Sequence, residues 1–180
     1  QDGQTFTAGL LSYVSDSPRE DQRGATPEAD SGALRNKSDR QMQYLSLFAE
    51  HLFRFGSLSL TPGVRLEHIW QQVQEHVNAD KAGAGTPLAD AEEFDLVPLF
   101  GIGAAYDVAP RTQLYSNLSQ SYRPKIFSQA VPTGATNVIN DDLKEGKSWL
   151  FDVGARGRPW NALSWDVSYF LMKFYDQIGA

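Results

Sequence analysis

The stretch LSLTPGVRLEHIWQQ, residues 58–72, decides the fold because apolar side chains recur in it at every second position. Successive side chains of a β-strand point to opposite faces, so this period predicts a strand with one apolar and one polar face. Its 15 residues exceed the roughly 5–6 that are usual in soluble proteins and also the roughly 9–11 that cross a bilayer at a tilt. The mostly apolar series consists of Leu58, Leu60, Pro62, Val64, Leu66, His68 and Trp70. The polar or small series between them consists of Ser59, Thr61, Gly63, Arg65 and Glu67.

The same period recurs along the chain. It is clear in residues 94–107, 149–156 and 163–171, and less regular in residues 5–13, 40–55 and 112–122. Together with residues 58–72 these segments predict about seven strands.

Short and long connections alternate between the predicted strands. The short ones are residues 56–57, 108–111 and 158–161, and the long polar ones are Ser15–Asp39, Glu75–Glu92 and Lys125–Gly146. Long structureless loops are uncommon in compact soluble domains. An up-and-down membrane barrel has short turns at one rim and long loops at the other, which favours this architecture.

Composition excludes several classes of protein. The 180 residues carry a net charge of −6 and no cysteine, which argues against nucleic-acid binding, a disulfide scaffold and a zinc-thiolate site. Mean hydropathy is −0.40, and no segment approaches the roughly 18 consecutive apolar residues of a spanning helix. A barrel strand stays compatible with these values because only alternate side chains meet lipid.

Five segments carry a family resemblance. In order, they are QYLSLFAE (43–50), LTPGVRLEH (60–68), LYSNLSQSYRP (114–124), LKEGKSW with DVGAR (143–149 and 152–156), and FLMKFYDQI (170–178). Together they resemble the barrel strands of TonB-dependent receptors, and TPGVRLEHI with FSQAVPTG (127–134) is most similar to the ferric-citrate type. Two departures are Glu145-Gly146-Lys147, which lacks the proline of the family's PEK motif, and Asp152, where the family usually has glutamate.

The resemblance implies an all-β fold of antiparallel up-and-down strands, with about seven strands of a roughly 22-stranded transmembrane barrel. Residues 1–180 would be an internal segment of the barrel domain, because neither a plug domain nor a TonB box is recognised in them. The implied function is import of ferric citrate or another ferric siderophore through the outer membrane of a Gram-negative bacterium. The TonB complex would supply energy through the missing plug domain. The iron would arrive chelated, so neither a resident cofactor nor a protein metal site is expected, and the protein would not be an enzyme.

An anionic chelate requires cationic and amide donors. We expect Arg19, Arg23 and Arg35 to supply them from the connection 15–39, together with Gln129, which lies in the segment that resembles the glutamine-bearing one of ferric-citrate receptors. That connection is net acidic, so solvated or locally paired arginines are the alternative.

Other charged or ionisable side chains have structural interpretations. Arg65, Glu67, Asp152 and Arg156 are expected to form structural pairs on the polar face of the sheet. His51 and His68 fall in the apolar series and are not expected to bind metal.

Two other functions remain open from the residues. A passive porin-like barrel shares the alternation and the loop asymmetry but lacks the ordered motifs, and an upstream plug-like domain would decide for the receptor. A soluble β-sandwich binding module would bury the apolar faces against each other.

Overall fold

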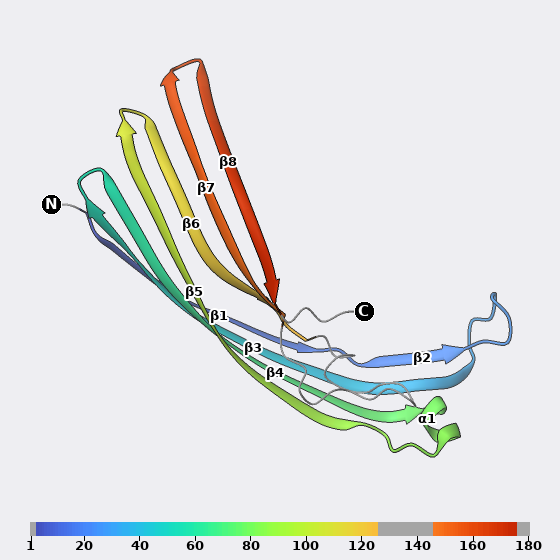
Figure 1. Cartoon of the computed structure of the whole chain (residues 1–180). Coiled ribbons are helices and arrows are strands. Elements are labelled where there is room, and N and C mark those ends of the chain that lie inside the picture. Colours follow the sequence, from blue (N-terminus) through green and yellow to red (C-terminus); the bar gives the residue numbers. More distant parts are fainter. Residues whose placement is uncertain (1–2, 126–145, 176–180) are drawn as a thin grey trace.

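The computed structural model describes residues 3–125 and 146–175, which form one antiparallel sheet of eight strands and one short helix (Figure 1). This confirms the all-β, antiparallel prediction. The elements are β1 (Thr5–Asp16), β2 (Arg19–Arg23), β3 (Ala33–Phe55), β4 (Leu58–Asn78), α1 (Ala79–Ala84), β5 (Asp90–Ala109), β6 (Thr112–Arg123), β7 (Gly146–Trp160) and β8 (Leu163–Tyr175).

The sheet is an up-and-down meander. Its order is β1-β3-β4-β5-β6-β7-β8, with the short β2 beside the outer part of β3. Tight hairpins join β3 to β4, β5 to β6 and β7 to β8 at one end, called here the short-turn end (Figure 1). Gly56 has φ +60° in the first of these hairpins, a conformation that glycine adopts without steric cost.

Strand register builds one continuous apolar face, called here the outward face. Cross-strand partners on this face are apolar in row after row, for example Leu118, which pairs with Ile102 on β5 and Phe151 on β7. Leu58 is half-buried and Val153 is exposed, while Phe100 and Val167 are 55% and 67% exposed. None of the described residues covers this apolar face. This contradicts the sandwich alternative, in which the face would be buried, and fits a lipid-facing wall.

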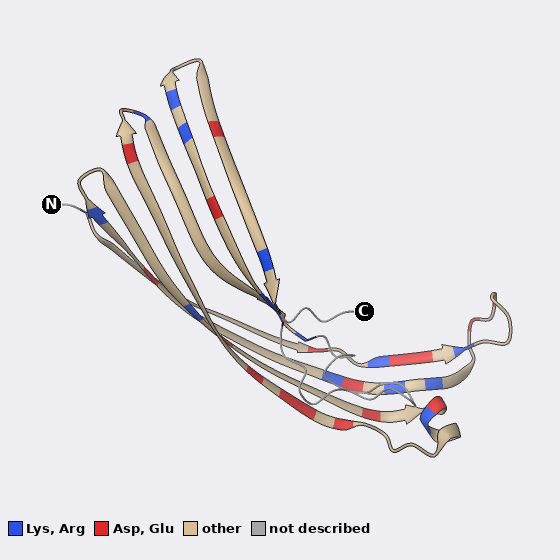
Figure 2. Ribbon diagram, in the orientation of Figure 1, with Lys and Arg blue, Asp and Glu red and all other residues tan. Residues whose placement is uncertain are grey.

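The opposite face, called here the polar face, holds the buried residues. Glu67, Gln71 and Asp95 are buried there, and register places them beside the small apolar core of Ile69, Val73, Val97 and Leu99. Charged residues crowd the sheet end opposite the short turns (Figure 2). Polar side chains on this face are thus shielded from solvent, whereas the large apolar ones on the other face are not.

Two connections predicted as long loops are largely regular structure. The connection Ser15–Asp39 contains β2 and the first residues of β3, which raises the number of strands from about seven to eight. The connection Glu75–Glu92 contains the end of β4, helix α1 and the start of β5. The prediction failed because the outward face becomes polar in these outer strand extensions, for example at Asp90 and Glu92 on β5, so the hydrophobic alternation stops. Most of the third connection, Lys125–Gly146, lies outside the described residues.

In the described part of the chain, no helix is both long and apolar enough to span a membrane.

The two faces predict opposite responses to charge at adjacent positions of β6. We expect Leu118→Arg, on the outward face, to lower the free energy of unfolding by about 2–4 kcal/mol in the complete protein folded into vesicles, because it places a guanidinium in hydrocarbon. The matched control is Ser119→Arg, on the polar face, which is expected to change it by less than about 1 kcal/mol. Urea unfolding measures both, and equal losses would contradict the assignment of faces.

Candidate functional site

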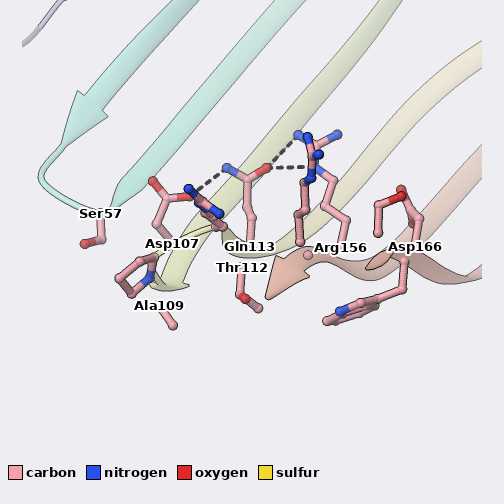
Figure 3. Close-up of a pocket in the computed structure, with 13 residues that line it drawn as sticks. Ser57, Asp107, Ala109, Thr112, Gln113, Arg156 and Asp166 are labelled. Carbon is pink, nitrogen blue, oxygen red and sulfur yellow. Dashed lines mark hydrogen bonds between the residues drawn. The ribbon is translucent and has the colours of Figure 1, made fainter. Parts of the chain in front are cut away.

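A polar row crosses four strands at the short-turn end of the polar face. Asp107, Gln113, Arg156 and Asp166 are successive register partners on β5, β6, β7 and β8 (Figure 3). The Gln113 side chain donates to Asp107 Oδ1 at 2.8 Å, and its Oε1 accepts from Arg156 Nε and Nη2 at 3.1 and 2.6 Å. One glutamine thus bridges a carboxylate and a guanidinium through the nitrogen and the oxygen of its side-chain amide.

Tyr115 contacts two members of this row, Arg156 and Asp166. A Cβ at Gly154 would lie 2.5 Å from Tyr115 Cζ, so the missing side chain gives the ring its path across β7. The phenol then reaches β8 and donates to Asp166 Oδ1 at 2.7 Å. The Arg156 guanidinium carbon lies 5.4 Å from the Tyr115 ring centroid, within cation–π range. Gly154 therefore lets one aromatic ring contact both Arg156 and Asp166.

A hollow of about 990 Å³ opens beside the row. Besides the row itself, it is lined by Arg111 from the β5–β6 turn, by Arg158 near the end of β7 and by Trp165. Arg111 and Arg158 donate to the Asn161 side-chain and backbone oxygens at 3.2 and 3.0 Å. Chemically, the hollow offers guanidinium and amide donors on a semi-rigid wall, and it can bind groups that accept hydrogen bonds.

A second network occupies the middle of the polar face. Arg65 Nε lies 2.6 Å from Glu67 Oε1 and donates to Ser46 Oγ at 2.9 Å, while the Tyr122 hydroxyl donates to Glu67 from β6. Glu67 is almost fully buried, and a buried carboxylate requires such partners. A shallower hollow of about 560 Å³ lies beside these residues. This network anchors β4 to β3 and β6.

Each of the four charged residues expected to form structural pairs has a structural partner. Arg65 pairs with Glu67, Arg156 binds Gln113, and Asp152 accepts from Asn117 Nδ2 at 3.4 Å.

At the outer end of β6, Lys125 anchors the chain to the polar face. Its Nζ lies 3.2 Å from Asp95 and contacts Glu93, and its backbone carbonyl accepts from Gln71 at 3.0 Å. Burial by itself would lower the pKa of Lys125, but hydrogen bonds to Glu93 and Asp95 outweigh burial and raise it. Lys125 therefore holds the end of the described segment after β6 against the polar face of β4 and β5.

Glu75 organises the tip of the β4–β5 connection. Its carboxylate accepts from Lys81 Nζ at 2.6 Å, from Asn78 at 3.1 Å and from the Ala89 backbone at 2.8 Å. Burial would raise the pKa of Glu75, but these three hydrogen bonds together hold it below its ordinary value. The Asn78 side chain in turn caps helix α1. This cluster explains why a buried lysine and glutamate occur in a connection that composition marks as a loop.

The three arginines expected to bind ligand lie on β2 and β3, away from the two hollows described above. Arg19 pairs with Asp21 at 2.8 Å, Arg35 pairs with Asp80, and Arg23 is exposed on β2. Local pairing therefore holds for Arg19, whereas Arg35 pairs with a residue of helix α1, outside its own connection. Neither hollow includes any of the three arginines. Gln129 lies outside the described residues.

The polar row was not expected as a unit. Its members lie on the polar faces of four strands, and the register was needed to align them. His51 and His68 lie among aromatic rings on the outward face: the His51 and Phe53 ring centroids are 4.2 Å apart, and those of His68 and Phe94 are 4.7 Å apart. Within residues 3–125 and 146–175, no cluster of histidines and carboxylates could hold a metal ion.

Comparisons with known proteins agree with this geometry. The family model described as "TonB dependent receptor-like, beta-barrel" matches residues 3–180. The sheet is similar to the ferric-catecholate import receptor Fiu of E. coli K12, with a TM-score of 0.73 and 14% identity over 96% of this chain and 29% of that one. The copper transporter OprC overlaps with a TM-score of 0.49 and 13% identity, over 92% of this chain and 35% of that one. No curated protein sequence matches.

Gly154 provides a test of how the row is built. We expect Gly154→Ala to lower the free energy of unfolding by about 1–3 kcal/mol, because the new Cβ would meet Tyr115 Cζ at 2.5 Å and the Val167 carbonyl oxygen at 2.7 Å. The control is Gly103→Ala on β5, where the nearest atom would be 3.8 Å away. Urea unfolding of the complete protein compares the two, and a Gly154→Ala loss no larger than the control's would refute the close approach.

The Glu75 cluster predicts a pH dependence. Because the folded pKa is depressed, the charge of Glu75 stabilises the fold above its ordinary pKa of 4.5, and this contribution is lost as the pH falls through the folded value. We expect Glu75→Gln to be less stable than the parent at pH 7, and the difference to shrink below about pH 4.5. Urea unfolding across that range measures it; a difference that grows on acidification would show the opposite pKa shift.

Proposed function

This chain belongs to the TonB-dependent receptor family, within its β-barrel domain, and on that premise we propose that the protein imports a ferric chelate across the outer membrane of a Gram-negative bacterium. The chain spans about a third of the length of the solved transporters it matches, since it covers 29% of one and 35% of the other. The family consists of transporters rather than enzymes. Activity, cargo and partners of the whole protein are therefore part of this proposal.

The observation that supports the proposal most is the two-sided sheet. The outward face exposes apolar side chains on every long strand, from Leu10 on β1 to Leu171 on β8. The polar face carries hydrogen-bonded charged groups such as Arg65 and Arg156. A wall with lipid on one side and a polar interior on the other requires this division.

The proposed mechanism assigns the chain a positioning role. The end of the sheet opposite the short turns, called here the long-strand end, would face the outside and collect the anionic chelate. The polar face would line the interior that a plug domain fills. The TonB complex would act on the plug, and the barrel wall would hold its shape while the plug moves. No resident cofactor or protein-bound metal takes part, because the iron travels as cargo.

For the cargo, we propose ferric citrate, with other ferric siderophores as the alternative. The support is the resemblance of residues 60–68 and 127–134 to ferric-citrate receptors. Arg19, Arg23 and Arg35, at the long-strand end, and Gln129 would supply donors to its carboxylates. Ligand binding at Arg19 and Arg35 would then compete with their ion pairs to Asp21 and Asp80.

Uptake of radioactive iron tests the proposal. The complete protein is expressed in iron-starved cells that lack their own receptors, and iron is supplied as ferric citrate or as a ferric catecholate, with and without functional TonB. We expect TonB-dependent uptake with citrate as the preferred chelator. A triple Arg19→Gln, Arg23→Gln, Arg35→Gln variant should reduce uptake severalfold, whereas Arg54→Gln, at the short-turn end, should not.

Two results would count against the proposal. Uptake that persists without TonB would favour a passive porin-like barrel. TonB-dependent uptake of the catecholate alone would keep the receptor assignment and exclude ferric citrate as cargo.

A further inference from the structure

The charged groups around the short-turn hollow are not paired with one another. The hollow is lined by three guanidinium groups, of Arg111, Arg156 and Arg158, and by the carboxylates of Asp107 and Asp166. Among the described residues, no ion pair within 4.0 Å joins any of these five groups to an opposite charge. This contrasts with the rest of the polar face, where Arg65, Lys81 and Lys125 each bind a carboxylate.

Neutral partners hold each charge in place instead. Arg156 binds the Gln113 amide oxygen, and Arg111 and Arg158 bind oxygens of Asn161. The two carboxylates accept from Gln113 and from the Tyr115 hydroxyl, as described above. A neutral acceptor orients a guanidinium without cancelling its charge, and each guanidinium keeps N–H donors beyond the bonds described here. The hollow therefore has a surplus of cationic donors.

From this arrangement we propose that the short-turn hollow binds a small oxyanion, with carboxylate or phosphate groups, through Arg156, Arg158 and Arg111. Guanidinium groups match carboxylate and phosphate oxygens in planar, bidentate geometry. The volume of about 990 Å³ suits a small molecule, for which sites span roughly 300–1,000 Å³. Three cations in one hollow stand out in a chain whose net charge is −6.

The site is preorganised by its backbone and by Gly154. The Arg158 amide donates to the Arg111 carbonyl at 2.9 Å, so the end of β7 is joined to the β5–β6 turn next to the hollow. Arg156 is fixed between Gln113 and the Tyr115 ring, whose path over β7 depends on Gly154. A site whose donors are already fixed loses less conformational entropy when the anion binds.

The source of the anion connects this site to the proposed function and rests on it. The hollow lies at the opposite end of the sheet from Arg19, Arg23 and Arg35, where the chelate would enter. A polycarboxylate chelator that has crossed the barrel would meet it at the exit, whereas free phosphate could reach it from the periplasm. Both have the same oxyanion chemistry, and their relative affinities distinguish them.

Calorimetric titration of the complete protein in detergent tests the proposal. Iron-free citrate and inorganic phosphate are titrated separately at fixed ionic strength into the parent and three variants. The double variant Arg156→Gln, Arg158→Gln removes two of the cations and should weaken binding at least about tenfold. Arg54→Gln removes a positive charge at the same end of the sheet without lining the hollow, and should leave binding unchanged.

Asp166→Asn is expected to raise the affinity for the anion, an effect that a loss of folding could not produce. Asparagine can still accept from the Tyr115 hydroxyl, but it removes a negative charge from the hollow. We expect it to bind the anion severalfold more tightly. Tighter binding of citrate than of phosphate would identify the chelator as the source, and the reverse order would identify free phosphate.

Three results would overturn the proposal: no saturable binding by the parent, equal affinities in the parent and the double arginine variant, or an equal loss in Arg54→Gln. None of these results depends on iron uptake. Failure of this site is therefore distinguishable from failure of the transport function, which the uptake assay alone decides.

Discussion

The structure depends on the hydrogen-bonded ladder of a sheet whose two faces meet different surroundings. A backbone that enters hydrocarbon must satisfy its N–H and C=O groups within the protein, and an antiparallel meander does so between neighbouring strands. The side chains are then free to separate by face. Leu66, Phe100 and Phe151 meet the apolar side, while Glu67, Gly101 and Asp152 meet the polar side. Fold, burial and function all follow from this separation.

The polar face uses two different ways to keep charge in the sheet. In the middle and at the outer end, carboxylates and cations pair directly, as Glu67 does with Arg65 and Glu75 with Lys81. At the short-turn end, amide and hydroxyl groups stand between them, and Arg156 remains available to an external anion. Direct pairs make the wall rigid, whereas charges held by neutral partners leave part of it able to bind.

Hydrophobic alternation was sufficient to predict the parts of the strands whose outward face is apolar, because only there do the two faces differ in polarity. It predicted Leu58–Gln72 as a strand, but could not follow β4 to Asn78, because the outward-facing positions from Gln72 on are polar. For the same reason β2 was predicted as loop. The Tyr115, Gly154 and Asp166 arrangement could not be predicted, because it depends on the register among three strands. Local ion pairing of Arg19 was foreseen from the acidic composition around it, whereas the role of Arg23 remains a prediction.

The central claim is that the outward face contacts lipid, and electron paramagnetic resonance on β6 tests it most directly. The chain lacks cysteine, so single cysteines at positions 114–119 can each carry a spin label in the complete protein in vesicles. We predict that collisions with lipid-soluble oxygen peak at positions 114, 116 and 118, and that collisions with a water-soluble nickel complex peak at 115, 117 and 119. Accessibility without this two-residue period, or with its phase reversed, would contradict the account.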